Sequence, residues 1–185
     1  MYHLHVCTLL IVIKFDNIPY DKPSDFTETS EYKNDVHICY TNNKRIEINY
    51  IKMKELNNKK HRKGLKLDGL PYDDRSQAVV LNKKMPIISK VNNEDIGIFN
   101  NQRFKIKKIG TFTITIEDDF KQELNINIPD FQKYFLPGYA TTTHSAQGMS
   151  ISEPYTIHEW DRMDQRLRYV ALSRSREYSY INIMK

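Results

Sequence analysis

The sequence predicts an α/β domain, a parallel sheet flanked by helices, into which a small antiparallel β-barrel is inserted. Two segments predict the α/β part. β-Forming residues at 36–40 lead through a polar turn into a helical pattern at 44–60. A second strand, at 139–142, runs into a polar turn that we expect to open a helix at Thr143.

Between residues 64 and 135 the periodicity changes, and this change predicts the barrel. Short strand-like runs are separated by turns containing Asn, Lys and Gly, at intervals of roughly ten residues. Phe112, Ile114 and Ile116 alternate with threonines, which is typical of a sheet with one buried face. The runs lie at 78–81, 85–88, 96–99, 104–109 and 111–116.

The last helix predicted by the sequence carries an apolar stripe. Met163, Leu167, Val170 and Ala171 recur at steps of three and four residues. Arg174 follows one turn after Val170, where its guanidinium could leave the packed face and reach across a cleft. An alternative interpretation is that the arginines at this helix end only complement the helix dipole.

The chain is basic, with a net charge of +5 over 185 residues, which suits a polyanionic partner. The excess is concentrated between residues 52 and 66, which include Lys59, Lys60 and Arg62. This strip is either a solvated helix face and loop or a series of phosphate contacts.

Residues 1–30 are assigned to a separate N-terminal segment. Its apolar run, Val6 to Ile13, is shorter than the roughly 20 residues that span a bilayer, and it lacks the features of a secretory leader, so we expect a buried strand. Cys7 and Cys39 each lie in apolar surroundings and indicate reduced thiols of an intracellular protein. The histidines show no metal-ligand spacing, so no metal site is expected.

Two C-terminal blocks closely resemble motifs of a known family. Residues 138–148, Gly-Tyr-Ala-Thr-Thr-Thr-His-Ser-Ala-Gln-Gly, and residues 169–174, Tyr-Val-Ala-Leu-Ser-Arg, resemble the fifth and sixth motifs of superfamily-1 helicases of the RecD-like and Pif-type branch. Residues 38–49 are similar to the fourth motif. The resemblance covers the second motor half of such helicases.

The resemblance implies a RecA-like domain of the P-loop NTPase type, built from residues 31–66 and 136–185. It also implies that residues 67–135 form an inserted Src-homology-3-like barrel. A strand of that barrel at 84–87 and a turn at 100–102 are similar to the family's pattern, but each lacks its glycine. An asparagine can adopt the left-handed conformation that such a glycine would take.

The resemblance also assigns roles to single residues. Arg174 is implied as the catalytic arginine finger, a group worth on the order of 10³–10⁵ in the rate of phosphoryl transfer. Gln147 and Gly148 are implied to face ATP. Arg45 is the nearest candidate for a contact with its terminal phosphate, a surface arginine being the alternative.

Three further residues, Thr141, Thr143 and His144, resemble those that grip the phosphodiester backbone. The alternatives are a β-prone strand end for the threonines and a core position for the histidine. The family often has Lys where Ser145 stands, so one phosphate contact would be missing.

No G-x-x-x-x-G-K-[ST] segment occurs in this sequence. Glu94-Asp95 follows two asparagines instead of an apolar strand, so it is not the acidic pair that holds magnesium. We therefore expect no ATP hydrolysis by this chain alone. ATP and Mg²⁺ are implied only in complex with a complementary, separately encoded N-terminal half.

The sequence thus predicts the C-terminal part of an ATP-dependent DNA helicase, acting in replication or repair on single-stranded DNA, without a membrane. The alternatives are a stand-alone module that binds single-stranded nucleic acid and an inactive helicase remnant. Abundant Asn, Ile, Lys and Tyr suggest an AT-rich genome, and with the fragmentary helicase they suggest a large DNA virus as the source.

Overall fold

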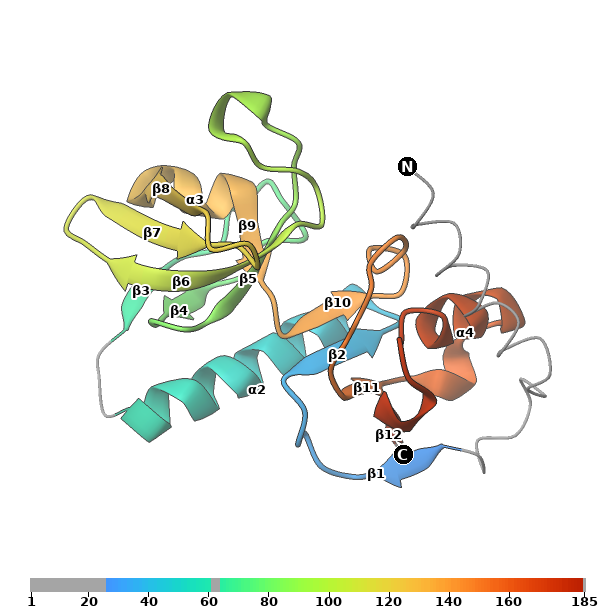
Figure 1. Ribbon diagram of the computed structural model, residues 1–185. Helices are drawn as coiled ribbons and strands as arrows, with labels where there is room; N and C mark the ends of the chain where they lie inside the picture. Colours follow the sequence, from blue (N-terminus) through green and yellow to red (C-terminus); the bar gives the residue numbers. More distant parts are fainter. Residues whose placement is uncertain (1–25, 61–63, 185) are drawn as a thin grey trace. The chain divides into compact units, whose positions relative to one another are not determined.

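The computed structural model describes residues 26–60 and 64–184, except the side chains of Lys59 and Lys60 (Figure 1). The strand expected at Val6 to Ile13 and the thiol of Cys7 lie outside the described residues. The chain divides into two compact units. Within the described residues, the first unit comprises 26–41 and 141–184, and the second comprises 42–140.

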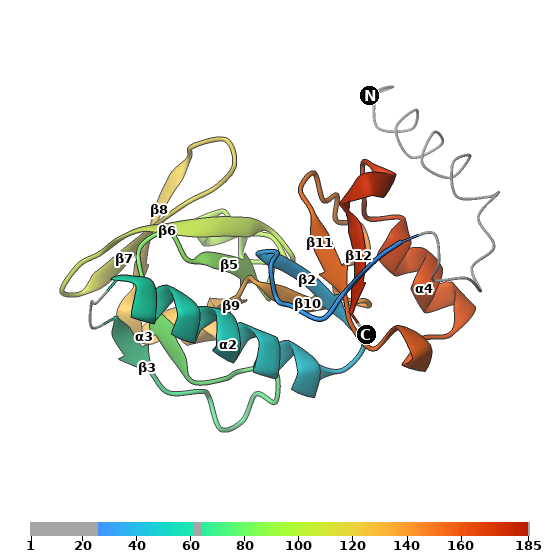
Figure 2. The same ribbon diagram turned by 90° about the horizontal axis from the view of Figure 1, so that it is seen from below.

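The first unit is built on a parallel sheet, as the sequence predicts. Parallel pairs join β1 to β12, β12 to β11 and β11 to β2, and β10 follows β2 in the order β1-β12-β11-β2-β10 (Figure 2). All four residues of β2 are buried, which is the pattern of a strand covered on both faces. The strands are β1 (Thr27–Thr29), β2 (Val36–Cys39), β10 (Ala140–Thr142), β11 (Tyr155–Ile157) and β12 (Ile181–Met184).

Among its described residues, the first unit also contains one helix and two 3₁₀ turns: α4 (Gln165–Leu172), η3 (Trp160–Arg162) and η4 (Tyr178–Tyr180). The carboxylate of Asp164 caps α4 by accepting a hydrogen bond from the Leu167 amide at 2.8 Å. Ala171 and Leu172 at the end of α4 pack into the core with Ile38 and Tyr155. The predicted C-terminal helix is confirmed, but it begins two residues after Met163.

The helix expected at Thr143 does not form, and residues 143–148 make a series of turns instead. Thr143 is fully buried, and both its amide and its hydroxyl donate to the Cys39 carbonyl, at 2.8 and 3.2 Å. A hydroxyl engaged with a neighbouring strand cannot cap the amides that follow it. The capping prediction was therefore wrong because a long-range contact replaces the local one.

The second unit contains a five-stranded antiparallel sheet in the order β8-β7-β6-β5-β9, together with the β3-β4 pair. Four of the five predicted runs become strands, with ends shifted by one or two residues. The strands are β3 (Leu65–Leu67), β4 (Val79–Leu81), β5 (Pro86–Ser89), β6 (Arg103–Ile109), β7 (Thr113–Glu117), β8 (Glu123–Asn127) and β9 (Phe135–Pro137).

Two predicted details of this sheet were wrong. The run at 96–99 is not a strand, because the 3₁₀ turn η2 (Glu94–Ile96) precedes an isolated bridge at Ile98. Ile114 and Ile116 are fully buried as expected, whereas Phe112 is 81% exposed. The reason is that β7 begins at Thr113, so Phe112 lies in the turn before it.

Helix α2 (Asn42–Lys60) confirms the helix predicted at 44–60, and α3 (Ile128–Tyr134) precedes β9. Met53 of α2 packs with Val79 and Leu81 in the core of the second unit. The helix therefore groups with the antiparallel sheet, while the domain boundaries after residues 66 and 135 stay predictions. No helix among the described residues has the length and hydrophobicity needed to cross a membrane.

The connection between β3 and β4 is tied down by charged side chains. The Lys90 ammonium, 3% exposed, pairs with the Asp73 carboxylate, 15% exposed. Arg45 of α2 donates to the carbonyl of Arg75 at 2.6 Å. Burial raises the pKa of Asp73, but hydrogen bonds from Lys90 and from the Arg75 amide outweigh burial and hold that pKa below 3.8.

We expect Asp73→Asn to lower the free energy of unfolding by about 3 kcal/mol at pH 7, because the buried Lys90 ammonium loses its counter-charge. Because the folded-state pKa of Asp73 is depressed, its contribution is complete above pH 3.8 and disappears as the pH falls through the folded value. Urea unfolding at several pH values measures this difference. A wild type and an Asp73→Asn variant of equal stability at pH 7 would contradict it.

Candidate nucleotide- and nucleic-acid-binding site

The turn at 143–148 follows β10, and buried residues within it hold its backbone in place. Thr143 and Ala146 are fully buried, and the Ala146 amide donates to the Thr142 carbonyl at 2.9 Å. Gly148 has a φ of 86°, in the left-handed region, and a side chain there would meet open space. His144, Ser145, Gln147 and Gly148 are all exposed. The turn thus holds polar groups at the surface on a fixed backbone.

Arg174 lies just beyond α4, and its guanidinium is held in one orientation. Its three nitrogens donate to the Val170 carbonyl (Nε, 3.0 Å), the Met149 carbonyl (Nη1, 3.0 Å) and the Ser173 hydroxyl (Nη2, 2.8 Å). Burial lowers the pKa of Arg174, but the guanidinium stays charged at neutral pH. Because Met149 follows Gly148 directly, the structure brings this cation to the turn that carries Gln147.

The backbone on both sides of Arg174 is also fixed. The Arg174 carbonyl accepts the Ile151 amide at 2.8 Å, and Ser175 forms a parallel bridge with Ile151. Tyr155, fully buried in β11, donates its hydroxyl to the Ala171 carbonyl at 2.8 Å. Burial raises the pKa of the Tyr155 hydroxyl more than nearby Arg174 lowers it, so it stays a donor. These contacts fix the end of α4 and the position of the Arg174 backbone.

Glu159, which the sequence analysis missed, organises the segment after β2. Its carboxylate accepts the amides of Tyr40 and Thr41 at 3.1 and 2.9 Å and the Thr41 hydroxyl at 3.0 Å. It also pairs with Arg162, whose guanidinium lies over the Tyr40 ring. Glu159 comes two residues after β11, so a polar residue after a strand was the only available signal.

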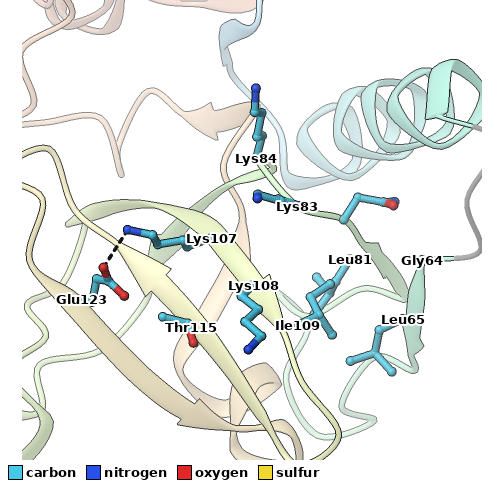
Figure 3. A pocket seen from close by; sticks show the side chains of 11 residues that line it. Gly64, Leu65, Leu81, Lys83, Lys84, Lys107, Lys108, Ile109, Thr115 and Glu123 are labelled. Atoms are coloured by element: carbon cyan, nitrogen blue, oxygen red, sulfur yellow. Dashed lines mark hydrogen bonds and ion pairs between the residues drawn. The ribbon is translucent and has the colours of Figure 1, made fainter.

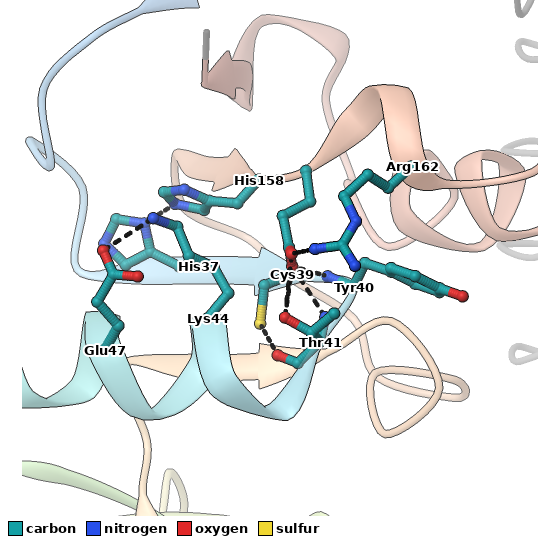
Figure 4. A network of polar contacts seen from close by, with 9 residues as sticks. His37, Cys39, Tyr40, Thr41, Lys44, Glu47, His158 and Arg162 are labelled. Carbon is teal, nitrogen blue, oxygen red and sulfur yellow. Dashed lines mark hydrogen bonds and ion pairs between the residues drawn. The ribbon is translucent and has the colours of Figure 1, made fainter.

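Beside this network, the buried His37 and His158 face each other at 3.0 Å between Nδ1 and Nε2 (Figure 4). Within the described part of the chain, no group of three or more His, Cys, Asp or Glu side chains could hold a metal ion. The thiol of Cys39 is buried, and its Sγ donates to the carbonyl of Thr141 at 3.4 Å.

The residues that are predicted to contact nucleic acid differ in their exposure to solvent. His144 is exposed, as a ligand contact requires. Thr141 is 7% exposed, and Thr143 is fully buried with its hydroxyl donating to the Cys39 carbonyl at 3.2 Å. The contacts of these two residues with nucleic acid stay predictions. The side chains of Lys59, Lys60 and Arg62 lie outside the described residues.

Arg45 belongs to the second unit and is 3% exposed, so the surface arginine considered as an alternative is excluded. Its guanidinium donates to the Asn42 side chain at 3.2 Å and to the Arg75 carbonyl. A contact between Arg45 and the terminal phosphate stays a prediction.

We expect Tyr155→Phe to lower the free energy of unfolding by about 1–2 kcal/mol, because the buried Ala171 carbonyl loses its side-chain donor. Chemical denaturation measures this change. Tyr50→Phe is the matched control, since Tyr50 is 60% exposed and its substitution should have no measurable effect. Equal losses for the two variants would show that the Tyr155 hydroxyl does not stabilise the end of α4.

No protein-family model and no curated protein matches the sequence. The structure, however, is similar to solved Pif1 helicases. Bacteroides Pif1 bound to ssDNA matches with a TM-score of 0.67 and 17% identity, over 99% of this chain and 49% of that one. Bacteroides Pif1 in complex with ADP-AlF3 and ssDNA matches with 0.62 and 18%, over 96% and 48%.

Pif1 helicase from Candida albicans matches with a TM-score of 0.62 and 11% identity, over 96% of this chain and 52% of that one. The chain therefore spans about half the length of these helicases. At such low identity the similarity concerns the fold, and it agrees with the RecA-like α/β architecture of the parallel sheet. The chain has the fold of the matching half of the Pif1 helicases.

Proposed function

We propose that this chain is the C-terminal part of an ATP-dependent DNA helicase. In this proposal it supplies Arg174 to a nucleotide that a P-loop-containing half holds. The observation that carries it is the hydrogen bond from the Arg174 guanidinium to the Met149 carbonyl, directly after the exposed Gln147-Gly148 turn. A fixed cation and exposed amide donors thereby lie on one stretch of surface.

Arg174 is held in a way that suits transfer to a phosphate. Its present acceptors are two carbonyls and one hydroxyl, all of them neutral. Hydrogen bonds from a guanidinium to an anionic oxygen are roughly twice as strong as those to neutral groups. A γ-phosphoryl group at this surface would therefore displace the Met149 carbonyl, and Arg174 would stabilise the negative charge that develops in the transition state.

On the nucleic-acid side, we assign a backbone contact to His144, which is exposed on the same turn. The similar Bacteroides structures contain ssDNA and ADP-AlF3, which supports single-stranded DNA and a nucleotide as ligands of the complete helicase. ATP and Mg²⁺ would be shared with the P-loop half. Action in viral replication or repair is part of the same proposal.

We also propose a fold for the inserted antiparallel part of the chain. Five short antiparallel strands, with helix α3 before the last one, support a Src-homology-3-like barrel inserted at residues 67–135, and the last strand, β9, ends two residues after that range. The basic strip that includes Lys59, Lys60 and Arg62 remains a candidate for further phosphate contacts.

The test is to mix the chain with a separately produced P-loop half from the same source and to measure ATP turnover stimulated by single-stranded DNA. We expect no turnover by the chain alone and a drop of roughly 10³-fold or more in the mixture for Arg174→Ala. Arg174→Lys should recover little, because an ammonium lacks the planar fork of a guanidinium.

Arg166→Ala is the matched control, since Arg166 is an exposed arginine of α4, the helix that precedes Arg174. This variant should keep full turnover. Turnover by the chain alone that Arg174→Ala removes, or an unchanged rate for Arg174→Ala in the mixture, would contradict the proposed role.

A further inference from the structure

The second unit contains an open groove of about 1150 Å³ that the proposed function does not use (Figure 3). Its walls come from β3, β4, the turn between β4 and β5, and the face of β6, β7 and β8. Four lysines line it, Lys83, Lys84, Lys107 and Lys108, and Glu123 is the one acidic lining residue. The groove is therefore strongly positive.

Two departures from regular backbone place these lysines in the groove. Consecutive residues of a regular strand point to opposite faces of a sheet. A bulge interrupts the pairing of β6 with β7 between Ile106 and Lys108, and both Lys107 and Lys108 line the groove. β-Bulges are a known means of redirecting a side chain.

The second departure is at Lys84, which has a φ of 72° although it carries a side chain. This left-handed conformation is unfavourable for residues other than glycine. The Lys84 amide donates to the Ile106 carbonyl at 2.7 Å, and the Met85 amide donates to the Asn82 carbonyl at 3.1 Å, which hold the turn. Two consecutive lysines thereby project from a rigid turn beside the bulge.

The lysines differ in how they are paired. Lys107 bonds Glu117 and Glu123 at 2.8 and 2.6 Å, and these hydrogen bonds raise the pKa of Lys107. Lys84 and Lys108 are exposed and have no carboxylate partner among the described residues. The remaining lining combines the aliphatic Leu65, Leu81 and Ile109 with Gly64, Asn82 and Thr115, and no aromatic side chain is among the lining residues.

We propose that this groove is a second nucleic-acid site, which binds the phosphate backbone of a duplex. Single-strand sites gain affinity by stacking bases on aromatic rings, and this lining offers none. A site that makes only phosphate contacts favours the polymer with the higher charge density. Double-stranded DNA carries one charge per roughly 1.7 Å and releases more counterions for each contact than a single strand does.

This proposal rests on the proposed function in one respect, the choice of nucleic acid as the polyanion that binds the groove. The competing ligand is an acidic polypeptide. The experiment measures the affinity of the full chain for fluorescent DNA duplexes of two unrelated sequences, across a range of salt concentrations and without nucleotide. Lys84→Gly combined with Lys108→Ala removes the two unpaired cations, and glycine suits the positive φ at position 84.

We expect this variant to bind both duplexes on the order of tenfold more weakly. The plot of the logarithm of the association constant against the logarithm of the salt concentration should become less steep, its negative slope decreasing in magnitude by about two. Lys105→Ala combined with Lys133→Ala is the matched control. Both lysines are exposed, on β6 and α3, but do not line the groove, so the control should bind like the wild type. Thermal unfolding confirms that both variants are folded.

Three outcomes would overturn the proposal: equal losses for the two double variants, a loss for single-stranded DNA that spares the duplexes, or polyglutamate bound as tightly as duplex and weakened by the same substitutions. Arg174→Ala should leave duplex binding unchanged. A negative result in the ATPase test therefore does not contradict the duplex-binding groove. Likewise, unchanged duplex binding by the groove variant does not contradict the proposed role of Arg174.

Discussion

The hydrogen bond between the Arg174 guanidinium and the Met149 carbonyl is the contact on which the proposed chemistry depends. It joins the end of α4 to the turn after β10, two segments that are 25 residues apart in the sequence. Without it, Arg174 would be only a basic residue at a helix end. With it, the positively charged guanidinium group of Arg174 lies beside the exposed Gln147 and Gly148.

That contact is supported by the parallel sheet. Tyr155 in β11 bonds the end of α4, and the Cys39 carbonyl in β2 accepts both donors of Thr143. The positions of the turn and of the helix end are therefore set by two paired strands. Residues that must be oriented to within a fraction of an ångström are best placed on such rigid elements. The buried threonine and tyrosine serve the site through the backbone they hold.

The two units present positive charge in different ways. Arg174 is a half-buried guanidinium bonded on three nitrogens, which suits a single, exactly oriented phosphoryl group. The groove lysines of the second unit are mostly exposed ammonium groups on long side chains, which suits repeated phosphates without fixed geometry. The first arrangement fits a catalytic contact, and the second fits sequence-independent binding.

Local patterns predicted the elements that local forces determine. Strand β2, helix α2 and the apolar stripe of α4 follow directly from residue type and period. The helix expected at Thr143 failed because its capping hydroxyl bonds a distant strand. Glu159, Tyr155 and the groove lysines were not found, since their roles depend on strand neighbours, a left-handed turn and a bulge. Such features arise from pairing between segments and leave no periodic trace in the sequence.

The most direct test of the central contact is ¹⁵N NMR of the Arg174 side chain in the chain mixed with its P-loop half. If Arg174 acts on the nucleotide, adding ADP with aluminium fluoride should shift its guanidinium signals, as the bond to the Met149 carbonyl is exchanged for one to the phosphoryl analogue. ADP alone should leave them in place. Identical Arg174 signals in both states of an assembly that unwinds DNA would show that this guanidinium never meets the nucleotide.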